Sequence, residues 1–178
     1  MTAALLTALA PPAAWSDGGS ARDRNDARGP LDIARVSHAH RGSAGSATLV
    51  HTMRLRSAWP VKKLRGNAFA LFYFDLRGRR GAGAERTVQV QYENGRLVAH
   101  MFDQVNSGQH VGAVTLRRPD RRTIRVSFPK SMLRKGLRSY KWNAATLVET
   151  PRGTCRSPGC IDWAPHGRKG LRYVKHAL

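Results

Sequence analysis

Apolar and polar residues alternate with a period of two along most of the chain from Leu31 onward. The clearest case is residues 123–129, where Ile124, Val126 and Phe128 alternate with Thr, Arg and Ser. Short alternating segments separated by Gly, Pro and Asp are typical of half-buried antiparallel strands. Because residues 31–148 show no sustained 3.6-residue periodicity, a helical fold is disfavoured. The pattern predicts an all-β antiparallel β-sandwich of the jelly-roll or immunoglobulin-like type.

Turn signals divide this pattern into strands. Residues 33–36 and 49–55 flank a Gly- and Ser-rich turn, and residues 88–92 and 97–102 flank Asn94-Gly95, a strong type I′ hairpin signal. The segment 69–74 is apolar on both faces, which predicts a central strand. Further strands are expected over 111–116 and 123–128, followed by a short helical turn near 130–134 and a last long strand within 137–148.

The N-terminal residues differ in composition from the rest. Residues 1–16 combine an apolar run with small residues, like the back half of a signal peptide, and Ala14-Trp15-Ser16 would allow cleavage before Asp17. The run has no basic start, so the alternative that it is not a leader stays open. Residues 17–30 are polar and Gly-rich, which predicts a flexible linker. Residues 31–178 are expected to form one domain, and no apolar run there approaches the roughly 20 residues that span a bilayer.

The two cysteines favour export. Cys155 and Cys160 are separated by Arg-Ser-Pro-Gly, whose Pro-Gly turn could bring them within bridging distance. A disulfide closing so short a loop would stabilise the fold by only about 2 kcal/mol. A zinc site would need more ligands than this pair offers. We therefore predict a disulfide-bonded protein that is secreted, extracellular or associated with the cell wall.

The net charge of +20 is the strongest compositional feature. Such a charge attracts polyanions through long-range electrostatics and counter-ion release, although a GC-rich genome also favours arginine codons. Sixteen Lys or Arg and only three acidic residues lie between Arg117 and Lys175. The residues predicted to contact a polyanion are Arg117, Arg118, Arg121, Arg125, Arg134, Lys135 and Arg138.

The order of strand phrases carries a resemblance to a known group. The phrases DIARVSHAHRG, ATLVHTMRLR, FALFYFDLRGR, TIRVSFPKSML and YKWNAATLVET, followed by CRSPGC and DWAP, span residues 31–165. This order resembles small secreted actinobacterial proteins of unestablished function with a carbohydrate-binding-module-like (DOMON-like) β-sandwich. The group's central strand commonly ends in an acidic cluster, whereas here Asp75 is followed by Leu76-Arg77. The resemblance implies a fold and a secreted location, and no activity.

No catalytic residues are assigned. Glycoside hydrolysis needs two carboxylates that flank one bond, and no sequence feature pairs any two of the acidic residues after position 31. The chain also lacks a Gly-x-Ser-x-Gly elbow. No cofactor is indicated.

Histidines and one tryptophan remain as ligand candidates. His38 and His40 lie two apart on one strand face, and His51 could approach diagonally from the partner strand, so these three imidazoles are weak candidates for metal ligands. The alternative is that they are solvated or hydrogen-bonded. Trp163, close to the cysteine pair, is the aromatic residue that could stack on a sugar.

The sequence thus favours a secreted, non-enzymatic binding or accessory module that contacts anionic or glycan material of the cell envelope through a basic face. A nucleic-acid-binding protein without sequence specificity is the alternative if the chain is not exported. A hydrolase is the third hypothesis.

Overall fold

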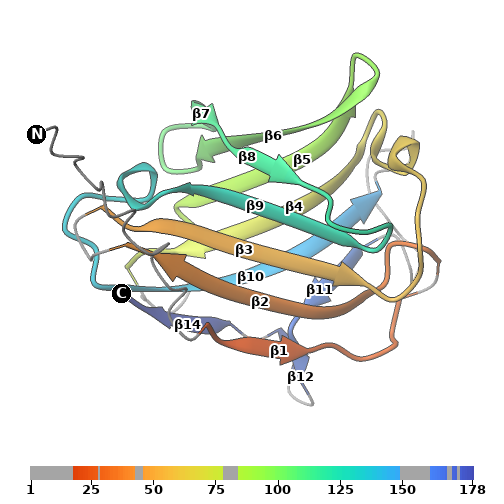
Figure 1. The fold of residues 1–178 in the computed structure, drawn as a ribbon, viewed down its shortest axis with the longest axis horizontal. Helices are drawn as coiled ribbons and strands as arrows, with labels where there is room; N and C mark the ends of the chain where they lie inside the picture. The colour runs from red at the N-terminus through yellow and green to blue at the C-terminus, as the bar shows by residue number, and fades with distance from the viewer. Residues whose placement is uncertain are drawn as a thin grey trace, which may run out of the picture.

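The chain forms two antiparallel β-sheets packed face to face (Figure 1), which confirms the predicted all-β sandwich. This computed structural model describes residues 18–27, 29–42, 46–77, 84–148, 161–167, 170–171 and 173–178. The cysteine pair and the expected signal-peptide residues 1–16 lie outside the described residues. In the described part, no helix is long and apolar enough to cross a membrane.

The first sheet has the strand order β1-β2-β3-β9-β8. Its strands are β1 (Ser20–Arg22), β2 (Ile33–Arg41), β3 (Thr48–Leu55), β9 (Thr123–Pro129) and β8 (Thr115–Arg117).

The second sheet has the order β11-β10-β4-β5-β6-β7, and β14 also pairs with β10. Its strands are β11 (Ile161–Ala164), β10 (Ser139–Val148), β4 (Ala68–Asp75), β5 (Arg86–Glu93), β6 (Arg96–Asp103), β7 (Gln109–Ala113) and β14 (Val174–Ala177). The short strands β12 (His166–Gly167) and β13 (Gly170–Leu171) pair with each other, and the 3₁₀ turns are η1 (Val61–Leu64) and η2 (Lys130–Met132).

The core lies between the sheets, where alternate residues of each strand point inward. In the first sheet Val36, Met53 and Ile124 lie opposite one another on neighbouring strands and are at most 1% exposed. Phe74 and Trp142 face them from the second sheet and are fully buried. The period-two pattern of the sequence is therefore the pattern of burial.

Several local predictions are confirmed. Strand β4 lies between β10 and β5, as expected of a segment that is apolar on both faces. The β5–β6 hairpin turns at Asn94-Gly95, both with positive φ (47° and 85°), as a type I′ turn requires. The helical turn expected near 130–134 is η2.

Two predictions need correction. The single strand expected over 111–116 is two strands in different sheets, because the chain crosses the sandwich at Val114, whose side chain is buried and whose N–H donates to the Ala99 carbonyl. The expected linker 17–30 contains β1, which pairs with β2 and extends the first sheet. The last long strand expected within 137–148 is β10, and the short strands β11 and β14 add to its edge.

Candidate functional site

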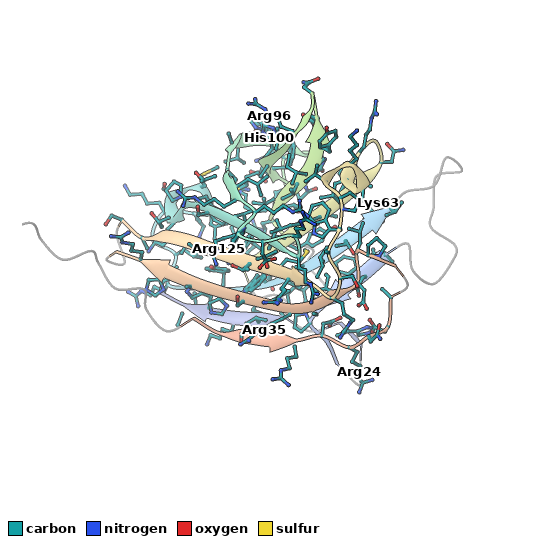
Figure 2. The ribbon with its side chains drawn as sticks, turned by 45° about the vertical axis from the view of Figure 1, so that its right-hand side comes forward. Arg24, Arg35, Lys63, Arg96, His100 and Arg125 are labelled. Carbon is teal, nitrogen blue, oxygen red and sulfur yellow. The ribbon has the colours of Figure 1, made fainter. Side chains whose placement is uncertain are left out.

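The outward side of the first sheet carries a set of arginines that we call the arginine face. Strand register places Arg22, Arg35 and Arg54 in one row across β1, β2 and β3, and pairs Arg125 with Arg117 across β9 and β8. All five side chains are exposed, and Arg35 and Arg125 are seen on this sheet in Figure 2. Among the described residues of these five strands, no outward position holds an acidic side chain.

A shallow hollow of about 270 Å³ lies in the middle of the arginine face. The hollow exists because the side chains around it are small. Hydroxyl groups and one guanidinium group lie at its rim. It is lined by Ser37, His38, Ala39, Val50, Thr52 and Arg125. A hydroxyl-lined hollow beside a guanidinium offers hydrogen-bond donors and a positive charge to an anionic group.

The other predicted polyanion contacts lie elsewhere. Arg118 packs 4.3 Å over the Trp59 ring and donates to the Trp59 and Arg121 carbonyls, so it holds a corner of the fold together. Arg134 lines a different hollow, which it shares with Glu85 and Asp103.

Lys135 and Arg138 are exposed in the segment between η2 and β10. Arg121 is exposed in the turn between β8 and β9 and lines a hollow with Arg118 and Trp59. Of the seven residues predicted from sequence, the structure therefore brings only Arg117 and Arg125 together on the arginine face.

The histidines predicted as weak metal candidates converge inside the sandwich. His38 lies directly opposite His51 in the β2–β3 register, where a diagonal approach was expected, and both side chains point into the core. His176 of β14 completes the group, stacked on His38 with 4.0 Å between ring centroids, and His40 lies 5.2 Å from His176. We call these four residues the histidine cluster.

Hydrogen bonds satisfy most of the histidine cluster internally. His40 Nδ1 lies 3.0 Å from His176 Nε2, and the Tyr140 hydroxyl bridges His176 Nδ1 (2.6 Å) and His51 Nε2 (2.8 Å). Trp142 Nε1–H donates to His38 Nδ1. This series of hydrogen bonds extends from the half-buried His40 through His176 and Tyr140 to the fully buried His51. His51 Nδ1 has no hydrogen-bond partner among the described residues.

Burial keeps the imidazoles of His38, His51 and His176 neutral. Desolvation, together with the neighbouring histidines, lowers the pKa of His38 to about 4 and of His176 to about 3. The pKa of His51 is lowered well below its usual value for the same reasons. Since the ring nitrogens bind Tyr140, Trp142 and one another, the geometry is that of a hydrogen-bonded core and not of an open metal site.

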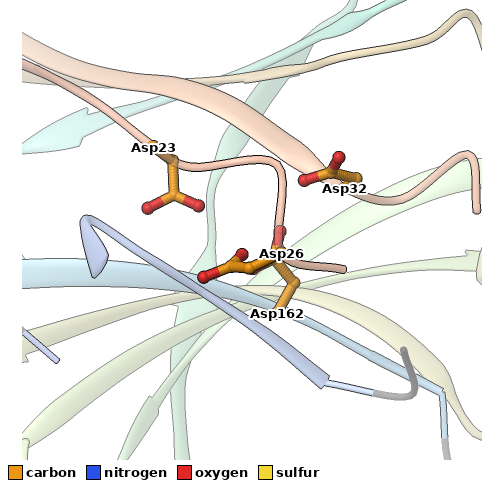
Figure 3. A group of neighbouring side chains, drawn as sticks. All are labelled: Asp23, Asp26, Asp32 and Asp162. Atoms are coloured by element: carbon orange, nitrogen blue, oxygen red, sulfur yellow. The ribbon is translucent and has the colours of Figure 1, made fainter. Parts of the chain in front are cut away.

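Four aspartates gather where the first sheet meets β11 (Figure 3). Asp23 and Asp26 follow β1, Asp32 precedes β2, and Asp162 lies on β11. One carboxylate oxygen of each lies within 4.8 Å of the others. We call them the aspartate cluster.

Backbone and side-chain donors bind one oxygen of each carboxylate. The N–H of Ile33 donates to Asp162 Oδ2 and the N–H of His166 donates to Asp23 Oδ1, both at 2.6 Å. Arg56 bonds Asp32 Oδ2 at 2.8 Å, and His166 Nδ1 lies 2.8 Å from Asp26 Oδ2.

Positive groups only partly balance the carboxylates of the aspartate cluster, as their raised pKa values indicate. Burial, reinforced by the neighbouring carboxylates, raises the pKa of Asp23 to about 6 and of Asp162 to about 7, against the opposing hydrogen bonds. Desolvation also raises the pKa of Asp32, although Arg56 opposes it. Asp23 Oδ2 and Asp32 Oδ1 are buried with no hydrogen-bond partner in the described part of the chain.

Trp163, the predicted stacking residue, lies on β11 and is half-buried. Its ring stacks on Tyr73 of β4 with 5.2 Å between centroids. Part of its surface is therefore already used within the protein.

The structure adds three kinds of residue to those predicted from the sequence. Arg22, Arg35 and Arg54 were not predicted, although the alternation of β2 and β3 already places Arg35 and Arg54 outward. His176 and Asp162 reach their clusters through short C-terminal strands that no clear pattern marked. Asp23 lies in the expected linker, where only the pairing of β1 could have placed it.

Comparisons with protein families, with characterised proteins and with solved structures find no match for this chain.

Proposed function

We propose that the protein is a non-catalytic binding module that holds anionic polymers of the cell envelope on its arginine face. The observation that carries this proposal is the array of five exposed arginines on one sheet, without an outward acidic side chain on the described strand residues. The net charge of +20 adds a long-range attraction for any polyanion.

The arrangement fits an extended ligand. Neighbouring strands lie about 4.8 Å apart, so the row formed by Arg22, Arg35 and Arg54 spans about 10 Å. Long arginine side chains can follow a flexible chain of phosphates or sulfates, and the planar guanidinium binds such groups through two hydrogen bonds. The hollow at Ser37, Thr52 and Arg125 would seat one anionic group in the middle of the array.

Nucleic acid is the alternative polyanion. The arginine face presents guanidinium groups without exposed aromatic side chains on its outward positions, whereas single-stranded nucleic acid is usually held by stacked bases as well. We therefore expect wall polymer to bind at least as tightly as DNA of equal charge.

The test is a salt series with three probes: a poly(glycerol phosphate) wall polymer, a single-stranded DNA of equal charge and a neutral polysaccharide. For the wall polymer, the logarithm of affinity should fall linearly with the logarithm of salt concentration. The triple variant Arg35→Gln, Arg54→Gln, Arg125→Gln should lower affinity at least tenfold and reduce the salt slope by about 3, because each arginine that binds a phosphate contributes about 1 to the slope.

A matched control removes the same charge elsewhere, through Lys62→Gln, Lys63→Gln and Arg96→Gln. These residues are exposed on η1 and at the start of β6, and Figure 2 shows Lys63 and Arg96 away from Arg35 and Arg125. Equal losses in both triple variants would show that only net charge matters, and the proposal would fail. Salt-insensitive binding of the neutral polysaccharide that Trp163→Ala abolishes would instead assign the function to aromatic stacking.

A further inference from the structure

We propose that Asp23, Asp26, Asp32 and Asp162 form a binding site for a Ca²⁺ ion that joins the two sheets at one end of the sandwich. This inference is independent of polymer binding on the arginine face.

The first support is the geometry of the donors. Ca²⁺ binds oxygen ligands at 2.3–2.6 Å, so two oxygens on opposite sides of the ion are about 5 Å apart. The four carboxylates each offer an oxygen, and these oxygens lie within 4.8 Å of one another. Figure 3 shows the four side chains converging from three separate segments of the chain.

The second support is the pair of buried oxygens without a partner. Asp32 is 3% exposed and Asp23 9% exposed, yet Asp32 Oδ1 and Asp23 Oδ2 accept no hydrogen bond from any described residue. Folded proteins rarely leave buried polar atoms unsatisfied. A cation between these carboxylates would satisfy both oxygens at once.

The outer hydrogen bonds match the surroundings of a metal site. Ile33 N–H donates to Asp162, His166 N–H to Asp23 Oδ1 and Arg56 to Asp32 Oδ2. In Asp23 and Asp32 the second oxygen is the unpaired one. In metal sites, hydrogen bonds of this kind to the ligating carboxylates orient them toward the ion. Arg56 forms its ion pair with Asp32, and its second hydrogen bond goes to the backbone carbonyl of Asp23 and not to the Asp23 carboxylate.

The donor chemistry selects the ion. All four groups are hard carboxylate oxygens, which suit Ca²⁺, whereas zinc and copper prefer imidazole and thiolate ligands. Mg²⁺ needs shorter bonds of about 2.0–2.1 Å and a near-octahedral set, whereas carboxylate oxygens up to 4.8 Å apart match the longer bonds of Ca²⁺. We therefore expect Ca²⁺ to bind more tightly than Mg²⁺.

A bound ion would hold the edge strand β1 and the segment after it in place. Asp23 and Asp26 belong to the β1–β2 connection and Asp162 to β11, so one ion would fasten the first sheet to the second. Because anything that binds only the folded state stabilises it, Ca²⁺ should raise the melting temperature.

The experiment is calorimetric titration of the EDTA-treated full chain with CaCl₂ or MgCl₂, together with thermal unfolding at 5 mM of each ion. We expect one Ca²⁺ per chain with a dissociation constant of 1 mM or tighter, a rise in melting temperature with Ca²⁺, and a smaller rise with Mg²⁺. Absence of both heat and a thermal shift in the wild type would overturn the proposal.

Variants locate the ion. Asp26→Asn alters the most exposed member and should fold normally, and Asp162→Asn alters a buried one. Both should lower Ca²⁺ affinity at least tenfold, while Glu93→Gln on β5, which removes the same charge outside the cluster, should leave it unchanged. If Asp26→Asn binds Ca²⁺ as the wild type does, or Glu93→Gln weakens binding equally, the site is not the aspartate cluster.

Discussion

The histidine cluster and the aspartate cluster lie at opposite ends of β2. Both bury ionisable side chains, but the polar atoms of the two clusters are satisfied to different extents. Asp32 and His38 are six residues apart, or about 20 Å along an extended strand. Tyr140 and Trp142 bond ring nitrogens of His38, His51 and His176, which burial keeps neutral, so that the one unpaired nitrogen, His51 Nδ1, carries no charge. The aspartates repel one another and leave buried oxygens unpaired. Burial of ionisable groups alone therefore does not mark a site, whereas unsatisfied like charges do.

The two clusters also have opposite proton linkage. Histidines with a lowered folded-state pKa bind fewer protons in the folded state, so the stability they contribute is full above pH 6.5 and falls as the pH drops below it. Aspartates with a raised pKa bind more protons in the folded state between pH 4 and 7, so their repulsion lessens as the pH falls.

The largest expected effect comes from breaking the histidine cluster at its bridge. Tyr140→Phe removes the hydroxyl that His51 Nε2 and His176 Nδ1 share, and leaves both nitrogens buried without a partner. We expect a loss of about 2 to 4 kcal/mol in the free energy of unfolding, measured by urea denaturation. Tyr73→Phe, on the outward side of the same sheet, should change it by less than about 0.5 kcal/mol. Similar losses in both variants would show that the bridge has no special role.

A smaller effect should appear in the pH dependence of stability. His51→Phe replaces a fully buried imidazole that packs between the aromatic rings of Phe74 and Phe128. The titratable groups that face it are His38 of β2, Tyr140 of β10 and His176 of β14.

Because burial lowers the pKa of His51 well below 6.5 in the folded state, the wild type should lose stability more steeply than the variant as the pH falls below 6.5. Urea denaturation at pH 8 and at pH 5 measures the two losses, and the loss should be larger in the wild type. The exposed His110→Gln is the control and should follow the wild type. Parallel pH profiles for His51→Phe and the wild type would contradict a neutral buried His51.

The smallest effect has the opposite sign. Asp23→Asn places an amide donor among carboxylate acceptors while its oxygen can still accept the His166 N–H. Without calcium, the variant should be about 1 to 2 kcal/mol more stable than the wild type in urea at pH 7.5, because like-charge repulsion is removed. A loss of stability of the same size would mean that the aspartates are already balanced by charges within the protein.

Local patterns in the sequence predict the strands and the outward or inward direction of their side chains, and long-range pairing decides the rest. The alternation of β9 and the Asn94-Gly95 turn are local signals, and both are confirmed. The inward direction of His51 also follows from its place beside Met53 and Leu49. The direct pairing of His38 with His51 depends on the register, which the alternation left open.

The aspartate cluster could not be predicted in this way. Asp32 and Asp162 are far apart in sequence, and Asp162 reaches Ile33 only because β11 joins the edge of β10. Asp23 and Asp26 lie in a polar, Gly-rich segment whose composition resembles that of a linker. Its order comes from pairing with β2, a contact that no local pattern encodes.

The most direct test of the proposed calcium site is a crystal structure of the protein grown with CaCl₂. A second crystal soaked in TbCl₃ would locate the ion by its anomalous signal. The account predicts one cation with oxygens of Asp23, Asp26, Asp32 and Asp162 at 2.3–2.6 Å, and none within the histidine cluster. Carboxylates that hydrogen-bond one another around an empty centre at millimolar calcium would contradict it.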